Sequence, residues 1–575
     1  MKRSAIIVSA FLAAAVSLHA QDTYDAINFS ENNYYGTART MGLGNAVTAL
    51  GGDLGSIGIN PAGSAVYSYG QFTFTPNLSF ASTKAAYASR ADQSYGDVTK
   101  TGKTRFTLPN VGMTFNLATG SNYGLKSMTF GMVANTTSLY NEKIVASGTN
   151  PYTSILGAMA YSATGYDESV LNDYGSYEAG YPWSAVLGYR SGMISHIAGT
   201  AGEYKGASEQ VVEDADGNLM IGLPAGAMLN QTYSRALYGS KSDVVFNWGL
   251  NFSDRFFVGI NLGIPTMTYT SKLTFNEAVP AGFEKDFTNY FLQSDGSVAE
   301  FNYLASEYSY DYMAQGDGIY GKVGLIWRPV PWLRLGAAAQ TPTFFTVSES
   351  YRMGGRVFFD HDSPDAEYSP EGTYTYNLRQ PWEANFGVAF TLGQLGLISL
   401  DYELQDFSVM KYMEADERLS VSQYFVPVNH ANENFTGLSH YLRAGLEVKP
   451  FNWLALRAGY TLKTSPEKYW KNNLGEVVTP STYVADYWDY YHTRRLTLED
   501  RYSVKANRHT FSLGAGYSSR GSFFMDAAVK LSCYPSVLYT PYQDYSVLDG
   551  EICAAPGINS FNSVVDAALT LGWRF

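Results

Sequence analysis

The sequence predicts an all-β fold: a 14-stranded antiparallel transmembrane β-barrel, to which a resemblance given below adds an N-terminal hatch (plug) inside the lumen. Three observations predict it: an unusual composition, a recurring alternation of apolar and polar side chains, and a regular exchange of short and long connections. Charged residues make up 16% and aromatic residues 15% of the 575 residues, whereas soluble proteins average roughly 25% charged residues.

Alternating side chains predict the strands, because successive residues of a strand point to opposite faces. In the segment 245–252 the apolar residues share one face, namely Phe246, Trp248, Leu250 and Phe252. Five hairpins of this kind surround tight turns near residues 254, 330, 394, 451 and 520. Four further strands bring the predicted number to fourteen, near residues 69–81, 104–117, 127–139 and 561–575.

The connections between these strands alternate in length. Long polar stretches separate the hairpins, at residues 82–103, 140–239, 272–315, 349–372, 409–436, 463–506 and 533–560. Outer-membrane barrels have an even number of strands, short periplasmic turns and long extracellular loops. With both termini on the periplasmic side every long connection falls outside, so residues 67–575 are predicted to form the barrel, with 140–239 as its longest loop.

The face opposite to the apolar one carries the charges, so the apolar face must meet lipid. It holds Lys322, Arg334, Asp401, Glu403, Arg443, Glu447, Lys449, Arg457, Asp526, Lys530 and Asp566. A backbone in hydrocarbon must satisfy its own hydrogen bonds, so the sheet must close. The mixed signs argue against an ion-selective ring. They leave two alternatives open: salt bridges that hold a plug, or side chains that solvate a water-filled lumen.

The N-terminus has the features of a secretory signal peptide over residues 1–20. Lys2-Arg3 precede an apolar run from Ala5 to Leu18, and Ala20 offers a cleavage site before Gln21. The net charge of −13 becomes −15 once Lys2 and Arg3 are removed, which is unfavourable for binding nucleic acid. We therefore expect a protein of the outer membrane of a Gram-negative bacterium, with outer-membrane lipid and the barrel-assembly machinery as partners.

A Gly- and Ala-rich segment precedes the first strand. It reads GTARTMGLGNAVTALGGDLGSIGINPAGSAVY over residues 36–67 and contains Asn60-Pro61-Ala62, with Gly42, Gly44 and Asp53 upstream. Small residues permit dense folding in a confined space. This segment and the barrel together resemble the FadL/TodX family of outer-membrane transport proteins for hydrophobic compounds, which makes residues 21–66 the expected hatch. The C-terminal ALTLGWRF, with Trp573 and Phe575, resembles a barrel assembly signal.

The resemblance implies a monomer that takes up long-chain fatty acids or similar hydrophobic molecules passively. The ligand would be captured at the outer loops, bind in the lumen and leave sideways at an inward kink of the third strand. That kink would fall within residues 131–137, with Gly131, Ala134 and Asn135 as the opening residues.

A ligand carboxylate in the lumen would need a cation. The inward candidates are Lys322, Arg334, Arg443 and Arg457. The alternative for these four is structural pairing with Asp401, Glu403 or Glu447.

Two features of the long connections carry further hypotheses. An apolar stretch offers candidate capture residues, Trp183, Leu187, Met193 and Ile197, unless these form the loop's own core. An exported chain with two cysteines suggests a disulfide between Cys533 and Cys553, with two free thiols as the alternative.

Catalysis has no support in the sequence. The histidines lack metal-binding spacing, and neither a nucleophile elbow nor a phosphate loop occurs. We therefore expect no enzyme activity, no catalytic residue, no cofactor and no metal. The alternatives to a hydrophobic channel are a general porin for polar solutes and a haemin-binding outer-membrane receptor.

Overall fold

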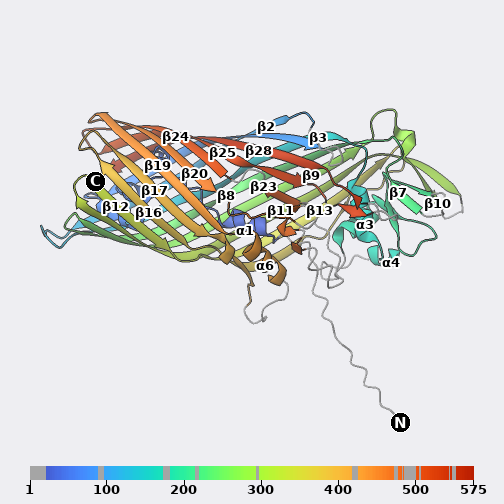
Figure 1. The fold of residues 1–575 in the computed structure, drawn as a ribbon, viewed down its shortest axis with the longest axis horizontal. Coiled ribbons are helices and arrows are strands. Elements are labelled where there is room, and N and C mark those ends of the chain that lie inside the picture. Colours follow the sequence, from blue (N-terminus) through green and yellow to red (C-terminus); the bar gives the residue numbers. More distant parts are fainter. Residues whose placement is uncertain are drawn as a thin grey trace, which may run out of the picture.

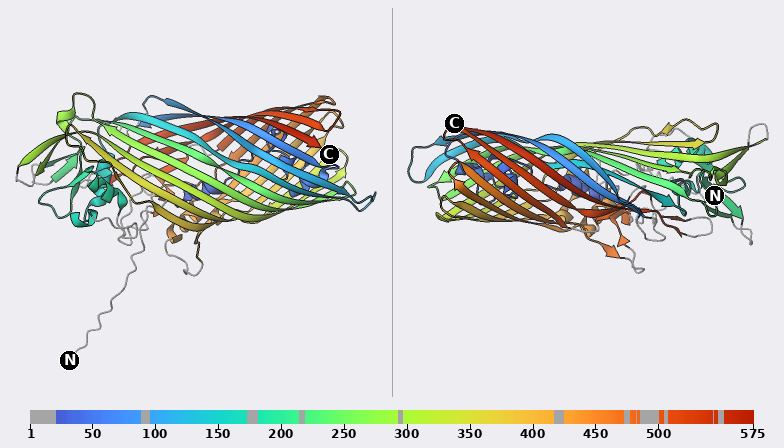
Figure 2. Two further views of the ribbon diagram at one scale, coloured as in Figure 1. Left: turned by 180° about the vertical axis from the view of Figure 1, so that it is seen from behind. Right: turned by 90° about the horizontal axis from the view of Figure 1, so that it is seen from above.

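The computed structural model describes residues 21–575 apart from 89–95, 173–181, 214–218, 293–296, 417–424, 472–476, 482, 485–499, 504–506, 543 and 547–551. The predicted signal peptide lies outside the described residues. The chain forms a closed antiparallel barrel of 14 strands (Figures 1 and 2), which confirms the predicted fold class.

The wall runs in chain order from β1 to β28, and several of its strands are interrupted. Its members are β1 (Gln71–Ala88), β2 (Thr99–Ala118), β3 (Leu125–Asn150), β8 (Leu229–Phe252), β9 (Phe256–Ala278), β11 (Val298–Val330), β12 with β13 (Leu333–Gln340, Phe344–Phe359), β15 with β16 (Gly372–Arg379, Glu383–Thr391), β17 with β18 (Gly396–Asp406, Lys411–Glu414), β19 (Leu438–Phe451), β20 (Leu454–Thr464), β23 with β24 (Asp500–Ser503, Asn507–Ser518), β25 (Phe523–Thr540) and β28 (Gly557–Arg574). Pro342 and Pro381 stand at two of the interruptions, where a residue without an N–H cannot continue the ladder.

The tight turns and the start of the wall lie at one end of the barrel, which we call the lower end. There the Gly70 N–H donates to the Phe575 carbonyl at 2.9 Å. The long connections all lie at the other, upper end. In Figure 1 the barrel lies on its side. The C-terminus marks the lower end, at the left of the picture, and the helices α3 and α4 mark the upper end, at the right.

The wall strands are longer than the sequence predicted, because the alternation continues upward with inverted phase. In the lower part of β9 Ile260 points outward and Asn261 inward. Further up, Thr268 points outward and Tyr269 inward. The polar stretches read as loops at 140–239 and 272–315 therefore begin and end as strand, and the connections shrink to residues 151–228 and 279–297.

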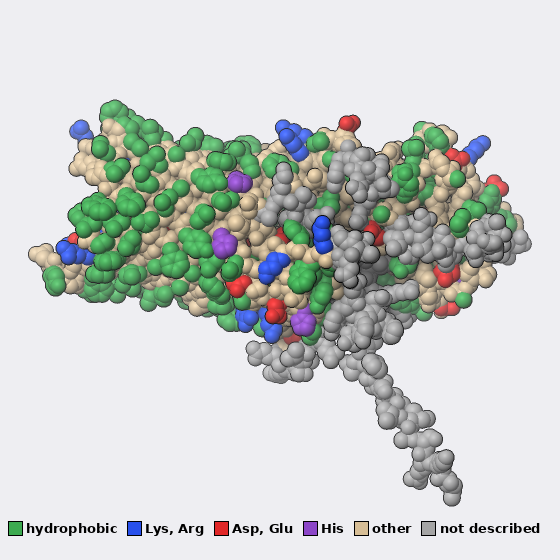
Figure 3. Space-filling model, in the orientation of Figure 1, with side chains coloured by type: hydrophobic (Ala, Val, Ile, Leu, Met, Phe, Trp, Pro, Cys, Tyr) green, Lys and Arg blue, Asp and Glu red, His purple; other side chains and the backbone are tan. Residues whose placement is uncertain are grey.

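This inversion divides the outer surface into two zones. Large apolar side chains are exposed around the lower half, among them Phe115, Trp248, Ile260, Leu325 and Leu442. In Figure 3 apolar side chains cover the lower half of the visible face, which is at the left. Charged side chains are more frequent on the upper half, toward the right. The lower zone has the surface that a membrane interior requires.

The upper connections fold into a cap over the barrel mouth. It contains α3 (Ile155–Ala163), α4 (Glu168–Leu171), α5 (Trp183–Arg190), β4 (Ile194–His196), β5 (Tyr204–Gly206), β6 (Gln210–Glu213), β7 (Leu219–Gly222), η4 (Glu284–Phe287), β10 (Thr288–Leu292), β14 (Glu367–Tyr368), η5 (Phe407–Val409), α6 (Val426–Phe435), β21 (Trp470–Lys471), β22 (Val477–Val478), β26 (Tyr545–Ser546) and β27 (Ile552–Cys553). None of the described helices has the length and apolar character needed to cross a membrane.

Residues 21–66 lie inside the barrel. They form α1 (Thr23–Ser30), α2 (Ala38–Gly42), η1 (Leu54–Ser56) and η2 (Pro61–Val66), and most of their side chains are buried. Figures 1 and 2 show this segment enclosed by the wall strands. We call it the lumen segment.

Candidate functional site in the lumen

The lower lumen is filled by residues 38–66, which lie directly against glycines of the wall. At each of seven glycines a Cβ would approach its nearest neighbour more closely than 3.0 Å, and the lumen segment supplies such a neighbour every time. They stand on seven strands: Gly249, Gly259, Gly324, Gly336, Gly387, Gly445 and Gly459. Only a residue without a side chain permits such close backbone approach, so the inner wall is shaped to this segment.

The Asn-Pro-Ala motif is part of this contact. The side-chain oxygen Oδ1 of Asn60 accepts from the Ala62 N–H at 3.0 Å and thereby caps the start of η2. The Asn60 amide donates to the Thr48 carbonyl at 2.7 Å and to the wall carbonyl of Leu325 at 3.2 Å. The motif therefore joins two stretches of the lumen segment to β11.

The upstream motif residues have equally local roles. Asp53 accepts from the Gly55 N–H at 2.8 Å and from the Thr37 hydroxyl at 2.5 Å. Burial raises the pKa of the Asp53 carboxyl, although the charge of Arg39 opposes this. Gly44 has a φ of +60° and lies against Gly459, and Gly42 lies against Gly514.

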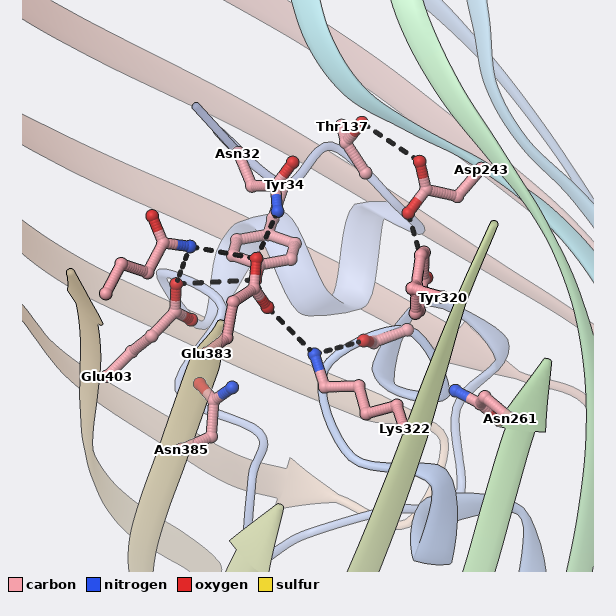
Figure 4. Close-up of polar contacts among 12 residues, drawn as sticks. Asn32, Tyr34, Thr137, Asp243, Asn261, Tyr320, Lys322, Glu383, Asn385 and Glu403 are labelled. Carbon is pink, nitrogen blue, oxygen red and sulfur yellow. Dashed lines mark hydrogen bonds and ion pairs between the residues drawn. The ribbon is translucent and has the colours of Figure 1, made fainter. Parts of the chain in front are cut away.

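The four inward cations named from the sequence all contact the wall or the lumen segment. Lys322 pairs with Glu383 at 3.1 Å and donates to the Gly58 carbonyl at 2.9 Å (Figure 4). Arg334 donates to the Leu50 carbonyl at 2.9 Å. Such side chains fix the segment in place.

Arg443 and Arg457 are engaged by carboxylates. Arg443 forms an ion pair with Glu403, and Arg457 pairs with Glu447 at 2.7 Å and with Asp526. Arg443 and Arg457 thus make two of the pairings that the sequence had left as the alternative, whereas Lys322 pairs with Glu383 and Arg334 contacts a backbone carbonyl.

The seam between β2 and β3 opens half-way up the barrel. The two strands pair from Ala118–Ser127 up to Asn110–Asn135, and no pair between them follows in the described residues. Above this point β2 still pairs with β1, and β3 still pairs with β8. Of the predicted opening residues, Gly131 and Ala134 lie in the paired stretch and Asn135 is the last residue of it, so the opening begins beyond them.

Above Asn135 the strand β3 carries a bulge at Thr136–Ser138. There the lumen segment covers its free edge. The Tyr35 N–H donates to the Thr136 carbonyl at 2.9 Å, and the Asn33 N–H donates to the Thr137 carbonyl at 2.5 Å. The Ser138 hydroxyl donates to the Glu31 carbonyl at 2.7 Å. Residues 31–35 therefore replace the missing strand partner.

Side chains of β2 span the opened seam. Arg105 donates to the carbonyls of Tyr140 and Gly239, and Lys103 donates to the carbonyl of Leu237. These contacts join side chain to backbone, so they can break one at a time. The upper seam is therefore held far more weakly than a continuous ladder.

A cavity of about 200 Å³ lies in the upper lumen beside α1. Tyr24, Ile27 and Glu31 line it from the lumen segment, residues 138–142 line it from β3, and Tyr539 is one of several aromatic side chains on its wall. Since residues 138–142 belong to the edge that β2 has left, the cavity borders the opened seam. We call it the upper cavity.

Two cations line the upper cavity that the sequence analysis did not single out. Lys463 pairs with Glu31 at 2.6 Å, and Arg508 lies 3.8 Å from the same carboxylate. Burial raises the pKa of Glu31, but the charges of Lys463 and Arg508 outweigh it and hold that pKa below its usual range. A carboxylate of the protein thus occupies an anion site in the cavity wall.

The candidate capture residues are buried in the cap. Trp183, Leu187 and Met193 belong to one large apolar cluster that also contains Phe29 of the lumen segment, and Ile197 is buried as well. The position of a Cβ on Gly355 of β13 would lie 2.9 Å from the Met193 sulfur, so this part of the cap packs on the wall. Their burial fits the alternative that the sequence had left open, the core of the loop, and capture stays a prediction.

Cys533 is a free cysteine in the described part of the chain, and the side chain of Cys553 is not among those described, so the disulfide stays a prediction. Cys533 is held in the wall opposite His509 and Ser563, whereas Cys553 pairs with Tyr545 in the hairpin of β26 and β27. The two residues therefore belong to different sheets.

The C-terminal strand closes the barrel. The Phe575 ring covers Gly70 and lies 5.7 Å from the Phe115 ring, and Trp573 lies 5.5 Å from Phe523. These aromatic contacts stand at the lower rim, where the last strand meets the first.

No protein-family model matches the sequence, and no curated protein does. Among solved structures the chain is similar to the toluene transporter TodX of P. putida, with 12% identity over 95% of this chain and 99% of that one and a TM-score of 0.44. A Pseudomonas aeruginosa FadL homologue gives 10% identity, 94% and 99% coverage and a TM-score of 0.45. The Ralstonia pickettii toluene transporter TbuX is 13% identical over 94% of this chain and 99% of that one, with a TM-score of 0.40.

Proposed function

We propose that this protein is an outer-membrane channel for the passive uptake of hydrophobic molecules such as long-chain fatty acids, with the lumen segment as its hatch. One observation carries the proposal: the upper cavity borders the place where the β2–β3 seam is unpaired. A ligand in that cavity has a lateral route to the membrane, while the route straight down the barrel is filled.

The lining of the upper lumen fits such a ligand. The inverted alternation turns aromatic side chains inward, and Tyr269, Phe275 and Tyr312 belong to one buried cluster with Phe29 of α1. Burying the apolar surface of a ligand in such surroundings is favourable by roughly 25 cal/mol per Å². The path that we propose leads from the cap through this aromatic zone to the upper cavity.

The cations of the upper cavity fit an anionic head group. A ligand carboxylate that displaced Glu31 from Lys463 and Arg508 would exchange one ion pair for another. Glu31 also accepts the Ser138 hydroxyl bond through its backbone carbonyl. Its displacement would therefore loosen residues 31–35 from the β3 edge and widen the seam.

A general porin for polar solutes is less well supported. Such a porin needs a water-filled channel along the barrel axis. Here the lumen segment contacts seven wall strands through glycines that admit no side chain. The packing leaves a hydrophobic solute with a sideways route as the better fit.

The test uses purified protein with residues 21–66 intact in liposomes. A long-chain fatty acid and an uncharged alkane of equal chain length are offered as hydrophobic probes, and a disaccharide as the polar probe. We expect both hydrophobic probes to enter faster than into empty liposomes, and the disaccharide to be excluded. Binding and transport of neither hydrophobic probe would refute the proposal, and rapid disaccharide entry would favour the porin.

A further inference from the structure

The buried carboxylate of Glu349 lacks a cation. Glu349 stands on the inner face of β13 and is 3% exposed. Its carboxylate accepts from the Tyr312 hydroxyl at 3.1 Å and from the side-chain amide of Gln21. Among the described residues no lysine, arginine or histidine forms an ion pair with it.

Several other lumen carboxylates are paired with a cation, although Asp53, Asp243 and Asp401 accept, within the described residues, only from hydroxyl or backbone N–H groups. Four of the paired carboxylates lie within 4.0 Å of a cation. These pairs are Glu383 with Lys322, Glu403 with Arg443, Glu447 with Arg457, and Asp566 with Lys530. Glu277, which has no such pair, caps α3 instead: it accepts from the Ile155 N–H at 2.9 Å, from the Ser154 hydroxyl at 2.5 Å and from the Gln231 amide at 2.6 Å. A buried carboxylate without such compensation costs several kcal/mol.

Gln21 is the first residue after the predicted signal peptide. Its side chain contacts Glu349, and the residue is only 5% exposed. The α-nitrogen of Gln21 is separated from its side-chain amide nitrogen by the length of one glutamine side chain. A positive charge on that α-nitrogen would therefore attract the Glu349 carboxylate electrostatically.

We propose that signal-peptide cleavage before Gln21 creates the cation that Glu349 lacks. A signal peptidase adds water across the Ala20–Gln21 peptide bond. The new carboxylate leaves with residues 1–20, and the α-amine stays on Gln21 and takes up a proton. An α-amino group has an ordinary pKa near 8, so it is largely an ammonium at neutral pH and pairs with Glu349.

This pairing makes proteolytic maturation the step that fixes the lumen segment. In the precursor the Gln21 nitrogen is a neutral amide, and Glu349 has hydrogen bonds but no ion pair. In the mature chain the segment is anchored at both ends, by the Gln21–Glu349 pair and by its continuation into β1. Loss of ammonia from Gln21 to give a cyclic lactam would remove the basic nitrogen, so the pair requires an uncyclised terminus.

The first test is made on protein purified from outer membranes. N-terminal sequencing and intact mass should give a chain that begins at Gln21 with a free, uncyclised amine. An amine-selective reagent at mildly acidic pH should label that amine slowly in the folded protein and rapidly in the unfolded one. A different first residue, a cyclised terminus or equal labelling rates would overturn the proposal.

The second test separates the ion pair from a general effect of chain ends. Chains that begin at Gln21 and chains that keep His19-Ala20 are refolded in detergent micelles, as the parent, as Glu349→Gln and as the matched control Glu277→Gln. The readout is the rate at which a protease cuts within residues 21–66. We expect the extension to raise that rate roughly tenfold or more in the parent and in Glu277→Gln, and to change nothing in Glu349→Gln. An equal effect of the extension in all three would refute the pairing.

Discussion

Two seams of the same barrel are built differently. The seam between β28 and β1 is paired from Gln71–Arg574 to Ala88–Gly557, over the full height of the wall. The seam between β2 and β3 is paired only up to Asn110–Asn135 and is bridged above that point by side chains and by residues 31–35. The β28–β1 seam is held by strand pairing over its whole height. The β2–β3 seam is held above Asn110–Asn135 by separate contacts that can break one at a time.

Proline explains where the second seam stops. Pro109 precedes the last paired residue of β2, and Pro76 lies at the irregularity in the pairing of β1 with β2. Neither residue has an N–H to donate, so both belong at edges and bulges. The difference between the seams teaches that the weak seam is encoded in the wall itself and then covered by the lumen segment.

The largest effect is expected from removing that cover. Deletion of residues 22–60 should leave the barrel folded, because the wall ladders do not depend on the segment. The lumen of a 14-stranded barrel would then fill with water, and single-channel conductance should rise by roughly tenfold or more. Unchanged conductance, with the strand content intact by circular dichroism, would count against a plug.

A reversible lock at the weak seam should have the next largest effect. The side-chain amide of Asn33 lies 3.5 Å from the Ser138 hydroxyl, so Asn33→Cys with Ser138→Cys can form a disulfide in a Cys533→Ser background. We expect fatty-acid entry into liposomes to fall to the background rate and to recover on reduction, because residues 31–35 can no longer leave the β3 edge.

The matched control for this lock lies on an intact ladder. Ser147 and Thr232 face each other across β3 and β8 with their hydroxyls 3.0 Å apart. A disulfide from Ser147→Cys with Thr232→Cys should leave transport unchanged. Equal inhibition by both disulfides would show that the barrel as a whole, and not the seam, must move.

A smaller effect is expected from the anion site. Lys463→Met should weaken binding of a long-chain fatty acid by roughly tenfold, since a hydrogen bond to a charged group contributes about 1.5–3 kcal/mol. Binding of an alkane of equal length should not change. Lys530→Met, which removes a cation paired with Asp566 elsewhere in the lumen, is the control and should leave both affinities as they are.

The smallest effect is expected from acid. Glu31 has a pKa below its ordinary value of 4.5 in the folded protein, so its ion pairs add stability at neutral pH that is lost as the pH falls through the lowered pKa. Hydrogen exchange of residues 31–35 should therefore speed up in acid in the parent, after correction for intrinsic rates. In Glu31→Gln it should be fast at both pH values, and a parent without pH dependence would contradict this role.

The sequence predicted the number of wall strands, their phase in the lower half and the position of every tight turn, because lipid imposes one apolar face on each strand. It failed in the upper half. There the apolar face turns inward, so β9 and β11 looked like polar loops at 272–315 although their period of two persists. Extending the inward phase of β20 from Arg457 by steps of two would have reached Lys463.

The contacts of the lumen were harder to predict. That Glu31 rather than a wall residue would face Lys463 depends on how the lumen segment folds, and its turns show no clear period. The expected kink at 131–137 includes the start of the β3 bulge at Thr136, whereas Pro109, next to the last β2–β3 pair, was not singled out. Burial of the candidate capture residues followed from cap packing on Gly355, which no local pattern reveals.

The glycines of the inner wall have a consequence for how this chain can vary. Each of the seven is fixed by what stands opposite to it, although none of them lines the upper cavity. A saturation scan read out by channel leakage should reveal them as a ring of intolerant positions around the wall. Variation of this sequence is thus restricted where the lumen segment approaches the wall backbone, while the outward lipid-facing positions on the same strands can exchange one apolar residue for another.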